Sequence, residues 1–220
     1  MKGTVFMKKF TVITSFLLIV IMTVTLAACT VTSSSAGILG NWKSTFDIGK
    51  IASAMPMDSS VESMKGMYES IMKAYDGVSV DIRFDLTEDK KAKMYFDEAS
   101  AEKVKSKIKE NLKGLLPELF KSFGVDDYKS ALEGMGLSED QFIDNNLNSI
   151  DLSQNFEGTY KVDGNKLYLT QSGEEENTDN YFVFEQNGNE LKITDAQGSG
   201  TAMISSEIKD ALLPLVFTRL

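Results

Sequence analysis

Apolar and polar residues alternate along several short stretches of the chain, a pattern typical of strands that bury one face. The first stretch is 39–48, where Trp42 falls on the apolar side. The most regular stretch is 79–87, and a second one over 92–96 follows it after a charged tip. We therefore predict a first strand and then a hairpin made of two further strands.

The C-terminal part of the chain repeats this alternation around two Asx-Gly pairs. The alternating stretches there are 158–162, 166–170, 181–185, 190–194 and 214–220. Asp163-Gly164 separates the first two, and Asn187-Gly188 separates the third from the fourth. Both pairs tolerate positive φ at two successive residues, so we predict two hairpins with type I′ turns. A short helix is expected over 205–213, before the last strand.

Two longer segments carry apolar residues at every third or fourth position, which predicts amphipathic helices. One helix is expected over 58–75. The other segment is 98–150, where Pro117 should kink a helix or start a new one. Asp126 is placed to cap a following helix, and Ser138 opens a capping-box sequence.

These elements predict an α+β fold. Its sheet is an antiparallel meander of about eight strands, with helical insertions after strand 1 (about 53–77) and after strand 3 (about 98–150). A closed barrel and a sandwich both fit such strands, and closure has the advantage of removing exposed edges. The chain holds a single cysteine, so no disulfide forms within it and the fold must rest on its hydrophobic core.

The two ends of this meander resemble the lipocalins. In that family a Gly-X-Trp sequence opens the first strand, and an arginine near the end of the barrel packs over the tryptophan ring. The chain has Gly40-Asn41-Trp42 and, near its C-terminus, Arg219. The resemblance implies an antiparallel lipocalin-like barrel closed by these residues. Lipocalins have no helical block in mid-barrel, so another antiparallel α+β fold remains the alternative.

The N-terminal leader predicts export and lipidation. Three lysines precede an uncharged apolar run over 10–26, which is the order of a secretory signal. The run ends in Leu26-Ala27-Ala28-Cys29, which resembles the lipobox of bacterial lipoproteins. That resemblance implies cleavage between Ala28 and Cys29 and acylation of the Cys29 sulfur. We therefore expect a signal peptide over 1–28, a lipidated tether over 29–37, and one domain over 38–220, held on the extracytoplasmic face of the cell membrane.

The acidic charge balance limits the partners of the chain. Its 23 Lys and Arg residues and 32 Asp and Glu residues give a net charge of −9, and loss of the three leader lysines would make it −12. We therefore expect no nucleic-acid partner, and a membrane contact made by the acyl chains alone. The chain has no histidine, which excludes Ser-His-Asp and Cys-His catalysis. We expect no enzymatic activity, no cofactor and no metal site.

Methionines gather in the first helical insertion, and their flexible thioethers suit adaptable apolar surfaces. Met64, Met67 and Met72 could form a lid over the barrel mouth, although core packing at helical spacing is the simpler explanation. Asp144, Asn146 and Asn148 alternate like the first ligands of a calcium loop, but the required glycine and glutamate are missing. We interpret that segment as a polar helix end.

Two functional hypotheses remain open. The first is a membrane-anchored binding module whose barrel holds a small apolar ligand. The second is a structural lipoprotein with a filled barrel, whose helical insertion docks a protein or envelope partner. The volume inside the barrel separates them, because a ligand needs a void of several hundred Å³.

Overall fold

Eight strands form one closed antiparallel barrel in chain order, with β8 returning to β1. The computed structural model describes residues 37–55, 65–148, 150, 152–176, 179–198 and 205–220. The strands are β1 (Gly40–Asp47), β2 (Ser79–Leu86), β3 (Lys91–Phe96), β4 (Asn155–Asp163), β5 (Lys166–Gln171), β6 (Tyr181–Asn187), β7 (Glu190–Gln197) and β8 (Leu215–Arg219). The barrel confirms the predicted eight-strand meander and its closure.

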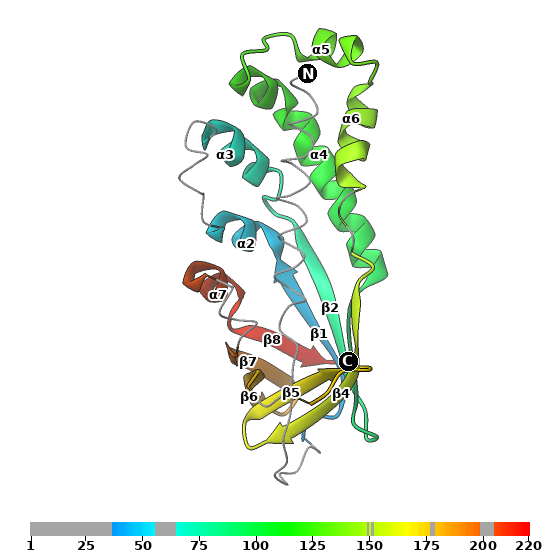
Figure 1. Ribbon diagram of the computed structural model, residues 1–220, viewed down its shortest axis with the longest axis vertical. Coiled ribbons are helices and arrows are strands. Elements are labelled where there is room, and N and C mark those ends of the chain that lie inside the picture. Colours follow the sequence, from blue (N-terminus) through cyan, green and yellow to red (C-terminus); the bar gives the residue numbers. More distant parts are fainter. Residues whose placement is uncertain (1–36, 56–64, 149, 151, 177–178, 199–204) are drawn as a thin grey trace.

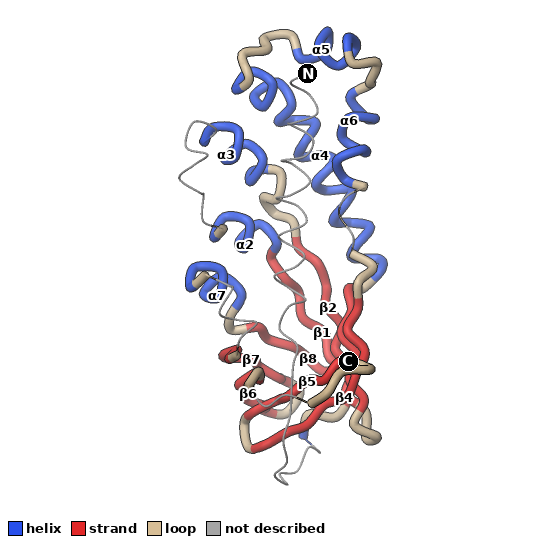
Figure 2. Tube along the Cα trace, viewed as in Figure 1, coloured by secondary structure: helices blue, strands red, loops and turns tan. Residues whose placement is uncertain are grey.

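Helices gather at one end of the barrel (Figures 1 and 2). They are α2 (Ile48–Ala54) and α3 (Lys65–Lys73) after β1, α4 (Glu98–Ser122), α5 (Tyr128–Gly134) and α6 (Glu139–Leu147) after β3, and α7 (Ser206–Leu212) before β8. We call this the helical end. From it α4, α5 and α6 extend away from the strands as a helical arm (Figure 1). The predicted insertions after strands 1 and 3 are thereby confirmed.

The inner face of the barrel is apolar because the strands alternate as their sequences predict. In β2, for example, Val80, Ile82, Phe84 and Leu86 are each at most 3% exposed. The residues between them, Asp81, Arg83 and Asp85, lie on the outer face and are partly exposed. This alternation places one continuous apolar core inside the barrel and a charged surface outside it.

Three helix boundaries differ from the sequence-based expectation. The first insertion begins at Ile48 rather than near 53, because the Asp47 side chain accepts a hydrogen bond from the Lys50 backbone (2.9 Å) and starts a helix there. The cap of α5 is Asp127 and not Asp126. Pro117 lies inside α4, which runs on to Ser122, so of the two alternatives for this proline, a kink or a new helix, the new helix is wrong.

The two hairpin turns lie one residue further along the chain than predicted. Asp163 pairs with Lys166, so Gly164 and Asn165 form the first turn. The second turn is Gly188 and Asn189, by the same pairing. Gly164 and Gly188 have positive φ values, 59° and 58°. Among the described non-glycine residues only Lys90 has a positive φ, so Asn165 and Asn189 do not. Glycine at the first turn position, with an ordinary second residue, is the type II′ pattern, so the type I′ assignment is wrong.

Within the described ranges, no helix combines the length and the apolar character needed to cross a membrane. The longest, α4, carries charged residues along its whole length.

Candidate functional site

A pair of residues at the end opposite the helices joins the first strand to the last. Trp42 of β1 stands directly across from Arg219 of β8, and the Arg219 guanidinium carbon lies 4.5 Å from the centroid of the Trp42 ring. The ring is fully buried, and its Nε1 donates a hydrogen bond to the Ile38 carbonyl oxygen (2.8 Å). We call this pair the clasp and this end the clasp end.

Gly40, beside the clasp, has a backbone conformation that favours glycine. Its φ is 135°, which L side chains rarely adopt, while a Cβ there would make only ordinary van der Waals contact with Arg219, at 3.7 Å. Arg219 also reaches past it to donate a hydrogen bond from Nη2 to the Gly37 carbonyl oxygen (2.7 Å). The structure therefore brings together all three residues that the lipocalin resemblance assigned to barrel closure.

The space inside the barrel near the clasp is occupied by large side chains. Phe84 and Phe217 are 1% and 0% exposed, and their ring centroids lie 5.7 Å apart. Leu86, Leu167 and Leu191 are likewise buried. The interior at the clasp end is therefore a packed apolar core.

The helical end of the barrel is covered by short helices. The backbone N–H of Ile48, the first residue of α2, donates to the Val78 carbonyl oxygen next to β2 (2.9 Å). α2 also packs against α7 and α3, and it buries Ile51 and Ala52. Any ligand that enters the barrel from this end must therefore pass these helices.

The three methionines proposed as a lid are only partly described. Met72 lies on α3, is 9% exposed and belongs to the hydrophobic core. Met64 and the side chain of Met67 lie outside the described residues. α3 itself is tied to the arm, since Lys73 Nζ and Ser70 Oγ both bond to Glu118 Oε1 on α4 (3.0 and 3.2 Å). The lid therefore stays a prediction.

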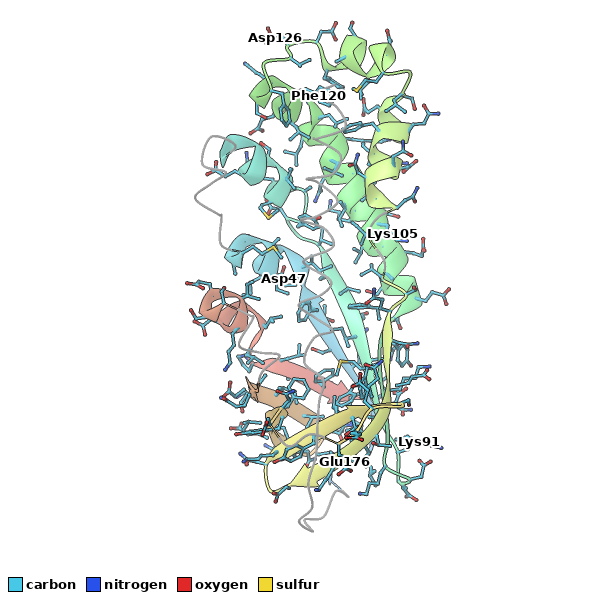
Figure 3. All side chains as sticks on the ribbon, viewed as in Figure 1. Asp47, Lys91, Lys105, Phe120, Asp126 and Glu176 are labelled. Carbon is cyan, nitrogen blue, oxygen red and sulfur yellow. The ribbon has the colours of Figure 1, made fainter. Side chains whose placement is uncertain are left out.

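A polar cleft of about 830 Å³ lies on the outer surface of the barrel. It is bounded by the outer faces of β2 and β3, by the first turns of α4, and by the segment 152–155 that leads into β4. Lys105 stands on the part of α4 nearest the barrel (Figure 3). A smaller cleft of about 340 Å³ lies on the other side of the α4 N-terminus, and Asp97 lines both.

The ion pair of Arg83 and Asp97 lies where the two clefts meet. Arg83 donates from Nε and Nη2 to Asp97 Oδ2 (3.0 and 2.7 Å), while Asp97 Oδ1 accepts from the Ser100 backbone (3.2 Å) and caps α4. The hydrogen bond from Arg83 holds the pKa of Asp97 below its usual range. Asp97 therefore fixes the start of α4 to the barrel wall by a charged contact.

Two lysines of α4, Lys109 and Lys113, form ion pairs with α6 across the arm. Lys109 contacts Asp144 of α6 (2.7 Å), and both Lys109 and Lys113 contact Asp140 (3.2 and 2.8 Å). Asp144 therefore lies in a helix and pairs with lysine, as expected for a polar helix end. No group of acidic or cysteine side chains that could hold a metal ion occurs among the described residues.

Sequence reasoning missed the outer cleft. Arg83, Asp85, Lys93 and Tyr95 lie between the apolar positions of the predicted hairpin, and nothing in their spacing shows that the first turns of α4 lie beside them. The Asp97 cap was the available signal, because a cap directly after a strand forces the helix to start at the barrel wall.

Comparison with known proteins agrees with this geometry. A family model described as a lipocalin-like domain matches residues 127–193. The chain is similar to lipocalin-like domains. The match runs from the α5 cap through β4, β5 and β6 into β7, so the similarity includes part of the helical arm and is not confined to strands. Searches of curated proteins and of solved structures found no match.

Proposed function

We propose that this protein is a lipid-anchored, extracytoplasmic binding module, without enzymatic activity, whose barrel takes a small apolar ligand. The observation that carries the proposal is the closed lipocalin-like barrel with an apolar inner face, because such barrels are suited to holding one small ligand. The leader lies outside the described residues, so the anchor rests on Leu26-Ala27-Ala28-Cys29 alone.

The ligand would enter at the helical end. The clasp end is filled by Trp42, Phe84 and Phe217, so room must be made at the other end. There the inner faces of β1, β2 and β3 present Phe46, Val80 and Phe96, all apolar and buried. Displacement of the short α2 and α7 would expose these residues without breaking a strand, since both helices lie in the connections between strands.

The anchor would hold the opposite end of the barrel. Arg219 binds the Gly37 carbonyl, so the tether reaches the domain at the clasp end. The helical end and the arm would then face away from the bilayer. Stable anchoring needs no positive surface, because each buried methylene of an acyl chain contributes about 0.8 kcal/mol.

Energy transfer from Trp42, the single tryptophan, tests the barrel site. The full-length protein in detergent is titrated with dansyl-undecanoic acid, and saturable transfer is expected. Val80→Phe adds bulk to the inner face of β2 and should weaken binding at least about tenfold. Ser79→Phe adds bulk to the outer face of the same strand and should leave binding unchanged. A folded wild-type protein without saturable transfer would contradict the proposal.

A filled barrel that docks a partner is the second candidate. The observation in its favour is at the far end of the arm, where Phe123 and Met135 are 43% and 46% exposed (Figure 3 labels the neighbouring Phe120 and Asp126). Exposed large apolar side chains at the tip of a projection are typical of contact sites. Failure of the dansyl titration, together with loss of envelope cross-linking in Phe123→Ser/Met135→Ser, would favour this function.

A further inference from the structure

We propose that the outer cleft between β2, β3 and α4 binds a neutral glycan. It is a second site on the other side of the sheet from the barrel interior, since Arg83, Asp85, Lys93 and Tyr95 line it from the outer faces of β2 and β3. Its volume of about 830 Å³ falls within the range of small-molecule sites, which is roughly 300–1,000 Å³.

The cleft presents polar groups that the fold does not use. Among the described residues, no hydrogen bond or ion pair is formed by the side chains of Glu98, Glu102, Lys105, Gln154 or Asn155, all of which line it. Carboxylates accept, ammonium donates, and amides do both. This mixture of uncommitted donors and acceptors matches a ligand that carries many hydroxyl groups, because each hydroxyl both donates and accepts.

An aromatic ring completes the lining. Tyr95 of β3 is partly exposed within the cleft, and Lys93 Nζ lies 5.5 Å from its ring centroid. Burial, and after it the negative charge of Asp85, raises the pKa of the Tyr95 phenol, so the ring stays neutral. A neutral aromatic surface beside hydrogen-bonding groups suits a sugar ring, which has an apolar C–H face and a polar rim.

The charges of the cleft argue against other ligand classes. Three cationic and four acidic side chains line it, so the net field is small. An anionic ligand would meet Glu98 and Asp97 at the α4 N-terminus, where the backbone N–H of Ser100 is already bonded to Asp97. An apolar ligand would leave charged groups such as Lys105 and Glu102 buried without partners, at a high cost in free energy.

The test uses calorimetry on the full-length protein in detergent. The probes are three neutral tetrasaccharides: chitotetraose, maltotetraose and cellotetraose. At least one is expected to bind with a Kd of about 1 mM or lower. Tyr95→Ala should weaken that binding at least about tenfold, since it removes the stacking surface. Glu102→Ala and Lys105→Ala lie on α4 outside the barrel wall and should each weaken it without affecting the fold.

The matched control is Tyr181→Ala. Tyr181 on β6 also has a lysine over its ring, with Lys166 Nζ 4.3 Å from the centroid, but it lies outside the cleft. This variant should bind the glycan like the wild type. The proposal is overturned if none of the three glycans binds at millimolar concentration. It is equally overturned if binding survives the three cleft substitutions, or if oligolysine binds the cleft and the glycans do not.

Discussion

Arg219 holds the barrel closed through contacts of two kinds. Its guanidinium lies over the Trp42 ring, and its Nη2 donates to the Gly37 carbonyl oxygen. The backbone pairing at this seam is short, with two register pairs, Trp42 with Arg219 and Lys43 with Thr218. The side chain therefore adds two contacts to a short backbone pairing between β1 and β8.

Replacement of Arg219 by alanine should lower the free energy of unfolding by about 1–3 kcal/mol, from the lost cation–π contact and the lost hydrogen bond. Urea titration followed by Trp42 emission measures this change. Lys192→Ala is the control, because Lys192 forms an exposed contact with Glu185 at 3.7 Å and should change the value by less than about 0.5 kcal/mol. Equal effects of both substitutions would contradict the role of the clasp.

Asp97 makes the stability of the fold depend on pH in the acid range. Its pKa in the folded protein lies below the value of about 3.9 in an unfolded chain. The contact with Arg83 therefore contributes its full stability above that value and loses it as the pH falls through the lower, folded-state pKa.

Asp97→Asn should keep an oxygen that caps α4 while removing the charge. We expect the variant to be less stable than the wild type by about 0.5–1 kcal/mol at pH 7, with the gap closing below about pH 4. Urea titrations at pH 7 and pH 3 measure it. Asp210→Asn, on the exposed face of α7, should show no such gap at either pH. A gap that persists unchanged at pH 3 would contradict the assigned charge effect.

At the scale of elements, two glycines show how differently strands and helices use the same residue. Gly158 lies in β4 at a point where a Cβ would overlap the Thr170 carbonyl oxygen of β5. Gly114 lies in α4, where a Cβ would meet no atom within 4 Å apart from the adjoining backbone of its own helix. One position needs glycine for the close approach of two backbones, and the other does not.

Replacement of glycine by alanine should therefore change the free energy of unfolding in opposite directions at these two positions. Gly158→Ala should lower the free energy of unfolding by about 2–3 kcal/mol, because the backbone of β5 must move. Gly114→Ala should raise it by about 0.5–1 kcal/mol through helix propensity. Thermal and urea denaturation of the two variants measure both values. Stabilisation by Gly158→Ala would show that β4 and β5 are not packed as described.

Strand positions were predictable from the sequence because alternation and burial coincide in a barrel. The inward set of β2 follows directly from the spacing of Val80, Ile82 and Phe84. Short helices were harder. α2 has seven residues and begins at Ile48, which also continues the alternation of β1, so the apolar pattern alone did not separate strand from helix.

The turns and the outer cleft show where sequence reasoning reaches its limit. Asp163-Gly164 identified the hairpin correctly, but pairing across the strands decides which two residues turn, and that is a tertiary property. The cleft depends on the direction of α4 after Asp97, which no residue spacing encodes. Closure of the barrel by Gly40, Trp42 and Arg219 could be predicted only from the resemblance to lipocalins.

At the scale of the whole molecule, we predict that attachment to the membrane depends on acylation of the Cys29 sulfur. Cys29→Ser should block acylation and leave an uncleaved precursor, whereas the signal-peptidase inhibitor globomycin should leave the wild type uncleaved but still acylated. Mass spectrometry and labelling with a fatty-acid probe measure both outcomes. Ser34→Ala in the tether is the control and should be processed normally. Normal cleavage and release of Cys29→Ser would reject the lipobox assignment.

The clasp also brings the two ends of the domain together. Gly37 accepts a hydrogen bond from Arg219, and the Leu220 backbone N–H donates to the Asn41 carbonyl oxygen (2.9 Å). A short flexible linker could therefore join residue 220 to residue 37, with new ends opened between α5 and α6 at the tip of the arm. Circular permutation at such a site is well tolerated where the ends are adjacent and the opened loop is exposed. The barrel would then be attached to a membrane, or to any support, by its arm, which reverses the face that it presents to its surroundings.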